Sequence, residues 1–496
     1  ADFHCTTKHA FAVTGGDTTV KMPFFIKNKK GSKGKSSSEK KTGRGGKRKL
    51  AGRPAASKKK KFGSEDDEIP SDSDIDSDEE QQRKEEPSSE EEEEETAQEK
   101  RLRLAKQYLA QLEAEEAEKK EDAEQDEDLI ADRLRQDVLE QGGRLHKSVA
   151  SELTEPSADS LQLLRGHQLA VTCLVICPKD QHIYTGSKDC SLIKWHIASG
   201  KRVKTIPGGR KGTEDRHKGH TAHILALAIS TDARFLASGD RNKLIHIWNP
   251  DDLQLLHTFT GHRDAVSGLA FRKNSHQLFS ASHDRSVKIW NLDEMAYVET
   301  LFGHQDVITG IDCLARERAV TSGGRDGTIR VWKVIEESQL VFQAHRCCVD
   351  CVALVNEETF FSGADDNSVC LWRVMKKKPV VTVHNAHSPG PEAPPIQQTE
   401  NWVTAVAALQ NTDVVASAGS KDGCVRLWRC GEDFRSLMPL FSVPVKGFVN
   451  SLQFSSDGRM LVAGVGQEHR LGRWWRIKEA RNGVVIIPLP RGGDQR

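Results

Sequence analysis

Cysteine pairs and histidines are the side chains of this sequence that could bind a metal or act as nucleophiles and bases. Cys348 and Cys351 have the C-x-x-C spacing of half a zinc site, but no second pair follows at a suitable distance. The two residues are an odd number of positions apart on an expected strand, so they should face opposite sides of it. Core packing is therefore the favoured interpretation, and we expect neither a metal nor a cofactor.

The 19 histidines could act as catalytic bases. Five of them belong to a repeating pattern described below, and no Ser-His-Asp set stands apart from that pattern. The stretch Gly31–Lys35 is rich in glycine and lysine, but it lies in a low-complexity tail and precedes no helix, so a phosphate loop is implausible there. We expect no catalytic residues and no enzymatic activity.

A repeat organises residues 160–478, and its clearest mark is a tryptophan that ends a short segment of alternating apolar and polar residues. The tryptophans are Trp195, Trp248, Trp290, Trp332, Trp372, Trp428 and Trp475. Six positions earlier stand Asp189, Asn242, Asp284, Asp326, Asp366, Asp422 and His469. Ten positions earlier, in the first five units, stand Thr185, Ser238, Ser280, Ser322 and Ser362. A further position, about 22 residues before the Asp position, holds His167, His220, His262, His304 and His345.

This pattern resembles the WD-repeat family, and the resemblance implies an all-β fold, a seven-bladed WD-repeat β-propeller. In that family the His, hydroxyl, Asp and Trp of a blade form a buried hydrogen-bond network. The network is doubtful in unit six, which lacks the His and has Ala418 at the hydroxyl position, and in unit seven, which has Val445 at the His position. Leu161–Leu164 should complete the last blade as its outermost strand, whereas Val484–Pro488 could add a strand or a cap.

The chain in front of the repeat has blocks of opposite charge that cancel to a formal net charge of zero. Residues 27–61 hold 16 Lys or Arg and one acid, and residues 64–95 hold 18 Asp or Glu and two bases. Such blocks stay solvated, so residues 1–95 should be a disordered basic and then acidic tail. Residues 96–153 should be a helical segment, because Leu102, Ala105, Leu109 and Leu112 follow a helical period. The propeller should span residues 160–478 and a C-terminal extension residues 479–496.

Two short patterns in the tail indicate nuclear function. A bipartite import signal is expected at Lys47, Arg48, Lys49, Lys58, Lys59, Lys60 and Lys61. Ser71, Ser73 and Ser77 each have an acid three positions on, which suits an acid-directed kinase. No secretory signal or apolar run of transmembrane length is visible, so we expect no membrane contact. Residues 1–21, which precede Met22, could be a translated leader or an alternative start.

Basic residues recur beside the Asp position, which the family places in a turn on one face of the ring. The residues just before it are Lys188, Arg241, His283, Arg325, Asp365, Lys421 and Glu468. Together with bases after the turn and in the C-terminal run around Trp474 and Trp475, they suggest a positive collar that could meet RNA phosphates. The RNA-binding candidates are Lys188, Arg241, Arg285, Arg325, Lys421, Arg470, Arg473 and Arg476. The alternative is an ordinary solvated rim.

Four stretches narrow the resemblance within the WD-repeat proteins: 96–106, 259–271, 297–305 and 473–476. They are similar to the family of WD-repeat subunits of the U-three small nucleolar ribonucleoprotein, over residues 95–489 or so. That resemblance implies a nucleolar protein that binds the box B/C region of U-three small nucleolar RNA, with box C/D core proteins as partners. It also implies a role in early pre-rRNA cleavage within the small-subunit processome. The alternative is a peptide-binding adaptor of chromatin or ubiquitin-ligase complexes, which would use the centre of the propeller face.

Overall fold

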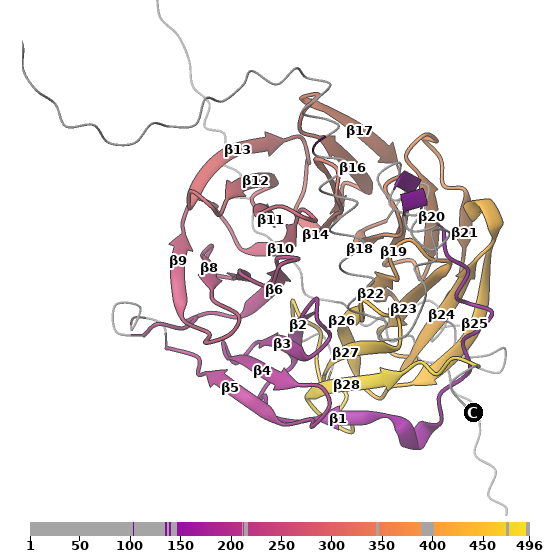
Figure 1. Cartoon of the computed structure of the whole chain (residues 1–496), viewed down its shortest axis with the longest axis horizontal. Coiled ribbons are helices and arrows are strands. Elements are labelled where there is room, and N and C mark those ends of the chain that lie inside the picture. The colour runs from indigo at the N-terminus through magenta and orange to yellow at the C-terminus, as the bar shows by residue number, and fades with distance from the viewer. Residues whose placement is uncertain are drawn as a thin grey trace, which may run out of the picture. The chain divides into compact units, whose positions relative to one another are not determined.

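Strands arranged around a central axis form the described part of the chain (Figure 1). The computed structural model describes residues 103, 134–135, 138–139, 146–210, 212, 217–343, 347–387, 401–472 and 476–492. Within these residues there are seven four-stranded antiparallel sheets, which confirms the seven-bladed β-propeller. The tail, with its import signal and its three serines, lies outside the described residues, as does most of the expected helical segment.

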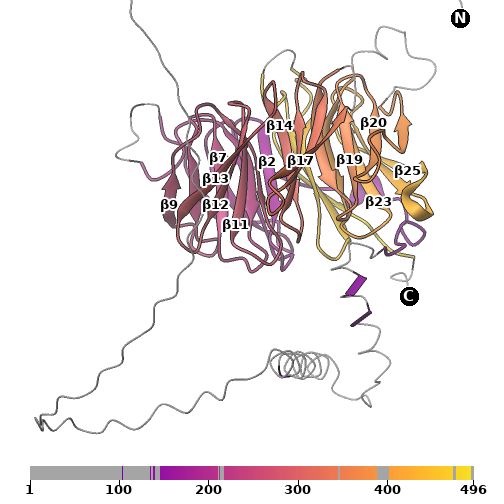
Figure 2. The same cartoon turned by 90° about the horizontal axis from the view of Figure 1, so that it is seen from above.

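Each blade runs from an inner strand at the axis to an outer strand at the rim (Figures 1 and 2). Blades one to three consist of β2 Val171–Ile176, β3 His182–Ser187, β4 Leu192–His196 and β5 Arg202–Ile206; β6 Ile224–Ile229, β7 Leu236–Asp240, β8 Ile245–Trp248 and β9 Leu255–Phe259; β10 Val266–Phe271, β11 Gln277–Ser282, β12 Ser286–Asn291 and β13 Ala296–Phe302. Blades four and five consist of β14 Ile308–Cys313, β15 Arg318–Gly323, β16 Thr328–Lys333 and β17 Ser338–Gln343; β18 Val349–Leu354, β19 Thr359–Ala364, β20 Val369–Arg373 and β21 Val381–Val383. Blades six and seven consist of β22 Val403–Ala408, β23 Val414–Gly419, β24 Cys424–Cys430 and β25 Leu437–Pro444; β26 Phe448–Phe454, β27 Met460–Gly466, β28 Gly483–Pro488 and β1 Gln162–Leu164. The short helices are η1 Ala158–Ser160 and η2 Glu432–Phe434.

The ring closes by pairing the two ends of the repeat region. In blade seven, β1 pairs with β28, with Gln162 opposite Ile486 and Leu164 opposite Val484. The prediction that residues 161–164 form the outermost strand of the last blade is therefore confirmed. This pairing removes the open sheet edges that an unclosed ring would expose.

The third strand of blade seven differs from the prediction. It is β28, and the described residues 467–472 and 476–482 belong to an inserted connection between β27 and β28. Counting from tryptophan failed because the third strand of this blade has none. The propeller consequently extends to residue 488, beyond the expected boundary at 478.

Residues 146–153 contain a turn at 150–152 and lie against blades six and seven, and do not form the end of a helix as predicted. The Asp413 carboxylate accepts the backbone N–H groups of Val149 (2.8 Å) and Ala150 (3.0 Å). Leu153 forms an antiparallel bridge with Arg491 near the other chain end. The hydrogen bonds of a helix would have used these same N–H groups, so the contacts with the propeller replace helical structure here.

A buried hydrogen-bond network ties together the strands of each of several blades. In blade three, His262 Nδ1 donates to Asp284 (3.0 Å), the Ser280 hydroxyl donates to His262 Nε2 (2.7 Å), and Trp290 Nε1 donates to the Ser280 oxygen (2.8 Å). Burial raises the pKa of Asp284, but the hydrogen bonds from His262 and Ser286 outweigh it and hold this pKa below its usual range. The histidine, serine and tryptophan side chains are buried, so each bond replaces a hydrogen bond that water would otherwise make.

The same network occurs in other blades, with two residues placed differently from the prediction. The sets are His167, Thr185, Asp189 and Trp195; His220, Ser238, Asp240 and Trp248; His304, Thr321, Asp326 and Trp332; and His387, Ser417, Asp422 and Trp428. In blade two the acceptor is Asp240, and Asn242 donates instead to Thr221 (3.0 Å). In blade four the hydroxyl is Thr321 and not Ser322.

Blade six has a complete network, contrary to the prediction that it lacks one. His387 Nδ1 bonds Asp422 (2.5 Å), and the Ser417 hydroxyl bridges His387 Nε2 (2.7 Å) and Trp428 Nε1 (2.8 Å). Between the last paired residues of the second and third strands, blades four and six have six residues, 323–328 and 419–424, whereas blades one, two, three and five have five. Counting ten residues back from tryptophan therefore reached Ser322 and Ala418, each one position too late. The histidine was missed because a long connection separates it from Asp422.

Polar side chains near the start of the inner strands join neighbouring blades. Ser267 of blade three donates to the Ile308 carbonyl of blade four (2.5 Å), and Thr309 donates to the Val349 carbonyl of blade five (2.6 Å). Equivalent bonds run from Thr172, Thr404 and Asn450 to Ile224, Val449 and Val171. The hydrophobic clusters likewise lie between adjacent blades, so each blade depends on its neighbours for its core.

We predict that His387→Ala lowers the free energy of unfolding by about 2 kcal/mol, because it removes the partners of Asp422 and Ser417 in a buried site. The control is His384→Ala, an exposed histidine three residues earlier in the same connection. Chemical denaturation of the two variants measures the difference. Equal stabilities would mean that the blade-six network contributes nothing.

Candidate nucleic-acid interface

We call the face of the propeller that carries the turns between second and third strands the upper face, and the opposite one the lower face (Figure 2). The upper turns of blades one to six are residues 188–191, 241–244, 283–285, 324–327, 365–368 and 420–423. Where a network is complete, its aspartate lies in or beside this turn and receives the histidine N–H. The buried networks thus position the turns on which the predicted collar depends.

Four collar candidates are exposed on these turns: Arg241, Arg285, Arg325 and Lys421. They belong to blades two, three, four and six, so the structure distributes them around the upper face. Blade five interrupts the series, because the exposed residues of its turn are Asp365 and Asp366. The collar is therefore positive over most of the ring and acidic at blade five.

Two basic residues of the turns adopt a left-handed backbone conformation, Lys243 with φ of 74° and Arg285 with φ of 69°. The equivalent residues of blades four and six are Gly327 and Gly423, which adopt it without a steric cost. A side chain in this conformation costs about 1 kcal/mol. Blades two and three therefore keep a cationic side chain at a position where glycine would be less strained.

Lys188, the collar candidate of blade one, is buried instead of exposed. Its Nζ lies 3.3 Å from a carboxylate oxygen of Glu468, and both side chains are less than one-tenth exposed. Glu468 comes from the inserted connection of blade seven, so this ion pair joins blade seven to blade one across the ring closure. Lys188 is therefore a structural residue of the upper face.

Arg470 reaches over the central channel and contacts the far side of the ring. Its guanidinium donates to the Thr309 carbonyl of blade four (2.9 Å). Burial, opposed by the positive charge of Arg470, raises the pKa of Asp350 on the blade-five inner strand to about 7. Burial and then the charges of Arg470 and Lys188 lower the pKa of His469 to about 3, so this histidine is neutral.

The inserted connection leaves little space at the upper end of the channel. Arg470 and Leu471 enclose a void of about 10 Å³ together with Leu225, Ser267, His283 and Thr309. A cavity of about 170 Å³ lies along the inner strands below Arg470. Sites for small ligands usually have 300–1,000 Å³, so both of these spaces at the upper end of the channel are smaller than such a site.

The C-terminal candidates are only partly described. Arg476 is exposed and its guanidinium donates to the Gln467 side chain (2.8 Å from Nε). Arg473, Trp474 and Trp475 lie outside the described residues. The proposed grip on unpaired bases by this run therefore stays a prediction.

A basic groove that the sequence reasoning missed lies at the upper rim between blades six and seven. It has a volume of about 300 Å³, and Arg165, Lys446 and Arg481 line it with Glu479. The three basic residues are exposed, and the floor is apolar, with Leu163 and Val485 among its residues. Arg165 lies two residues before His167, whereas Lys446 lies one residue after Val445, which stands at the His position of unit seven. The two residues therefore share no place in the repeat, and counting along the repeat could not have identified the groove.

The cysteines and histidines that could bind metal have structural contacts in the described residues. The Cys351 thiol lies 3.8 Å from the carbonyl oxygens of Gly363 and Val403, between blades five and six. Two clusters have metal-like spacing: His220, Asp240 and His246; and His387, Asp422 and Cys424. His220 and His387 each use both ring nitrogens in their blade network, so hydrogen bonding explains these clusters. No helix in the described part of the chain is long and apolar enough to span a membrane.

Comparison with known proteins gives a consistent result. A family model described as WD domain, G-beta repeat matches residues 158–196, 213–249, 253–291, 295–333, 336–373 and 395–429, which correspond to blades one to six. The U3 small nucleolar RNA-interacting protein 2 of Homo sapiens is 59% identical over 396 residues, covering 80% of this chain and 83% of the relative. Ribosomal RNA-processing protein 9 of Saccharomyces cerevisiae is 28% identical over 513 residues, covering 80% and 89%.

Two solved structures have the same fold at high identity. One is described as the structure of U3-55K, with a TM-score of 0.64 and 58% identity over 67% of this chain and 100% of the other. The second is described as the crystal structure of RRP9 WD40 repeats, with a TM-score of 0.65 and 57% identity over 68% and 100%. The similarity covers the whole of both solved chains and about two thirds of this one.

We predict that Lys188→Met lowers the free energy of unfolding by about 3 kcal/mol, because it leaves the Glu468 carboxylate buried without its cation. The double variant Lys188→Met with Glu468→Met should regain most of that loss. Urea denaturation of the two single variants and the double variant measures the coupling. Independent, additive losses would contradict a buried ion pair at the ring closure.

Proposed function

The chain belongs to the family of U3 small nucleolar RNA-interacting WD-repeat proteins, and from this premise we propose that it is a non-catalytic subunit of the U3 ribonucleoprotein. It binds U3 small nucleolar RNA with its upper face and holds it on a rigid propeller. The observation that carries this proposal is the set of four exposed cations on the upper turns, Arg241, Arg285, Arg325 and Lys421. Cations spaced around a rigid ring suit a folded RNA, whose phosphates lie on several strands.

The basic groove of Arg165, Lys446 and Arg481 extends this surface to the rim. Its cations can hold a phosphate, and its apolar floor can contact a sugar or an unstacked base. Lys188 is buried in an ion pair with Glu468, and the Arg470 guanidinium donates to the Thr309 carbonyl at the channel. In this proposal neither of these two predicted cations contacts RNA directly. In this proposal those two residues fix the inserted connection of blade seven, which forms the border between the collar and the groove.

Within the U3 RNA, we assign the box B/C region as the bound element, and box C/D core proteins as neighbours in the particle. The basis is the resemblance described above and the names of the relatives, one of which is a ribosomal RNA-processing protein. In the proposed role, RNA directs early pre-rRNA cleavage, and the propeller recruits and stabilises. The proposed place of action is the nucleolus, in the small-subunit processome.

The competing function, a peptide-binding adaptor, would use the centre of the upper face. Arg470 and Leu471 lie over that place, and the two spaces next to them have volumes of about 10 and 170 Å³. Crosslinking and sequencing of RNA bound to the protein in cells separates the two functions. Enrichment of U3 RNA supports the particle subunit, whereas an interactome without RNA dependence supports the adaptor.

The collar has a direct test. We predict that the combined variant Arg241→Glu, Arg285→Glu, Arg325→Glu and Lys421→Glu reduces U3 RNA binding at least tenfold, because cations that meet phosphates become repulsive. In filter binding of purified protein, the slope of log affinity against log salt should become shallower by about three, at about 0.7–0.9 per lost phosphate contact.

The matched control reverses exposed cations on a different surface, Lys376, Lys377 and Lys378, between the third and fourth strands of blade five. It changes net charge by a similar amount and should leave U3 RNA affinity within twofold. An equal loss in both variants would show that only overall charge matters. Unchanged binding in the collar variant would remove the upper face as the RNA site.

Nuclear entry has a separate test. We predict that deleting residues 27–61 reduces nuclear accumulation severalfold, because both basic clusters of the import signal are lost. Fluorescence imaging of the tagged chain measures it, and grafting a known import signal onto the deleted chain should restore entry. Normal nucleolar accumulation of the deleted chain would place the signal elsewhere.

A further inference from the structure

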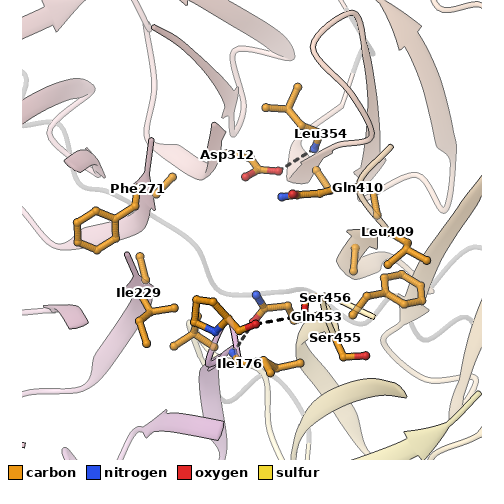
Figure 3. Close-up of a pocket in the computed structure, with 18 of the residues that line it drawn as sticks. Ile176, Ile229, Phe271, Asp312, Leu354, Leu409, Gln410, Gln453, Ser455 and Ser456 are labelled. Carbon is orange, nitrogen blue, oxygen red and sulfur yellow. Dashed lines mark hydrogen bonds between the residues drawn. The ribbon is translucent and has the colours of Figure 1, made fainter. Parts of the chain in front are cut away.

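The lower end of the central channel, in contrast to the upper end, opens into a cavity of about 530 Å³ (Figure 3). Inner strands of all seven blades contribute to its wall, and connections between first and second strands form its rim. The cavity is wide because four blades have alanine at the same inward position: Ala228, Ala270, Ala353 and Ala407. Its size is within the range of pockets that hold a peptide side chain with its neighbours.

The corresponding positions of blades four and seven carry the polar residues Asp312 and Gln453. The Asp312 carboxylate accepts the backbone N–H groups of Leu354 (2.7 Å) and Cys313 (2.9 Å), and Gln453 accepts that of Ile176 (2.9 Å). Asp312 is thereby held firmly against the wall, with the cavity in front of it (Figure 3). A carboxylate has about four lone-pair sites, so both oxygens can still accept further hydrogen bonds.

Asp312 has no cationic partner within ion-pair distance among the described residues, although Lys273 also lines the cavity. Burial raises the pKa of its carboxyl to about 6 despite the two backbone hydrogen bonds. A buried carboxylate of this kind gains most from a cation that enters the cavity. The apolar residues around it, among them Ile229, Phe271 and Leu409, would contact the aliphatic part of such a ligand (Figure 3).

We propose that this lower cavity binds a lysine or arginine side chain of a protein partner, with the cationic head on Asp312 and the aliphatic stem on the apolar wall. Lysine and arginine combine a long apolar stem with a terminal charge, which matches a cavity whose wall holds both apolar residues and a carboxylate, although its rim also carries polar residues such as Asp180, Lys273 and Gln410. The partner inserts this residue from the lower face, since the inserted connection of blade seven fills the upper end. The propeller thus joins an RNA on one face to a basic protein segment on the other.

The experiment selects random 12-residue peptides on phage against the purified full chain and measures the affinity of the enriched peptides by fluorescence anisotropy. Enriched peptides should share one central lysine or arginine, and replacing it with norleucine or citrulline should abolish binding. Asp312→Asn should weaken binding at least about 30-fold, as expected for loss of one partner of a buried charge pair.

The matched control is Glu357→Gln, another lower-face carboxylate that accepts two backbone N–H groups, from Ala315 (2.9 Å) and Arg316 (3.0 Å), but does not line the cavity. It should leave peptide affinity within twofold. If Asp312→Asn fails to fold, Ala270→Leu narrows the cavity without touching the carboxylate and should also abolish binding. U3 RNA binding should be unchanged in these variants, which separates this proposal from the RNA function.

Three results would overturn the proposal. One is an enriched set without lysine or arginine, or no enrichment. Another is equal peptide affinity of Asp312→Asn and the unaltered chain. The third is peptide binding that appears only after deletion of residues 27–61, which would make the chain's own basic tail the occupant of the cavity instead of a partner.

Discussion

The hydrogen bond from a buried histidine to the aspartate of an upper turn is the interaction on which the rest of the structure depends. His262 with Asp284 is one example, and Ser280 links that histidine to the Trp290 indole in the third strand. Because both ring nitrogens form hydrogen bonds, the histidine joins three elements: the connection from the preceding blade in which it lies, the second strand, and the upper turn. Arg285 follows the aspartate directly, so the bond that stabilises the blade also positions a cation on the surface.

Blade seven is stabilised by contacts other than the histidine–aspartate network. Its third strand has no tryptophan, and the blade is held by pairing of β28 with β1 and by the Lys188–Glu468 ion pair across the closure. The connection that replaces the short upper turn then brings Arg470 over the channel to blade four. The ion pair across the ring closure and the filling of the upper channel end therefore both come from one insertion. This insertion gives the two ends of the channel different properties.

Much of this architecture could be predicted from the sequence, because the repeat spacing reflects strand lengths that the fold keeps nearly constant. Seven blades, the closing strand at 162–164 and the exposed bases Arg241, Arg325 and Lys421 followed from counting. Counting residues back from the tryptophan missed Thr321, because the connection between the second and third strands of that blade has one more residue. It missed His387, because a long connection separates this histidine from Asp422. The burial of Lys188 could not be predicted, because its partner Glu468 is 280 residues away in the sequence and comes close only when the ring closes.

The central claim is that a propeller held rigid by buried networks presents its upper face to U3 RNA. Ultraviolet crosslinking of the particle purified from cells, followed by mass spectrometry of the RNA-linked peptides, tests this claim most directly. The linked residues should lie in the upper turns of blades two, three, four and six and beside the groove of Arg165, Lys446 and Arg481. Links confined to the connections of the lower face would contradict it.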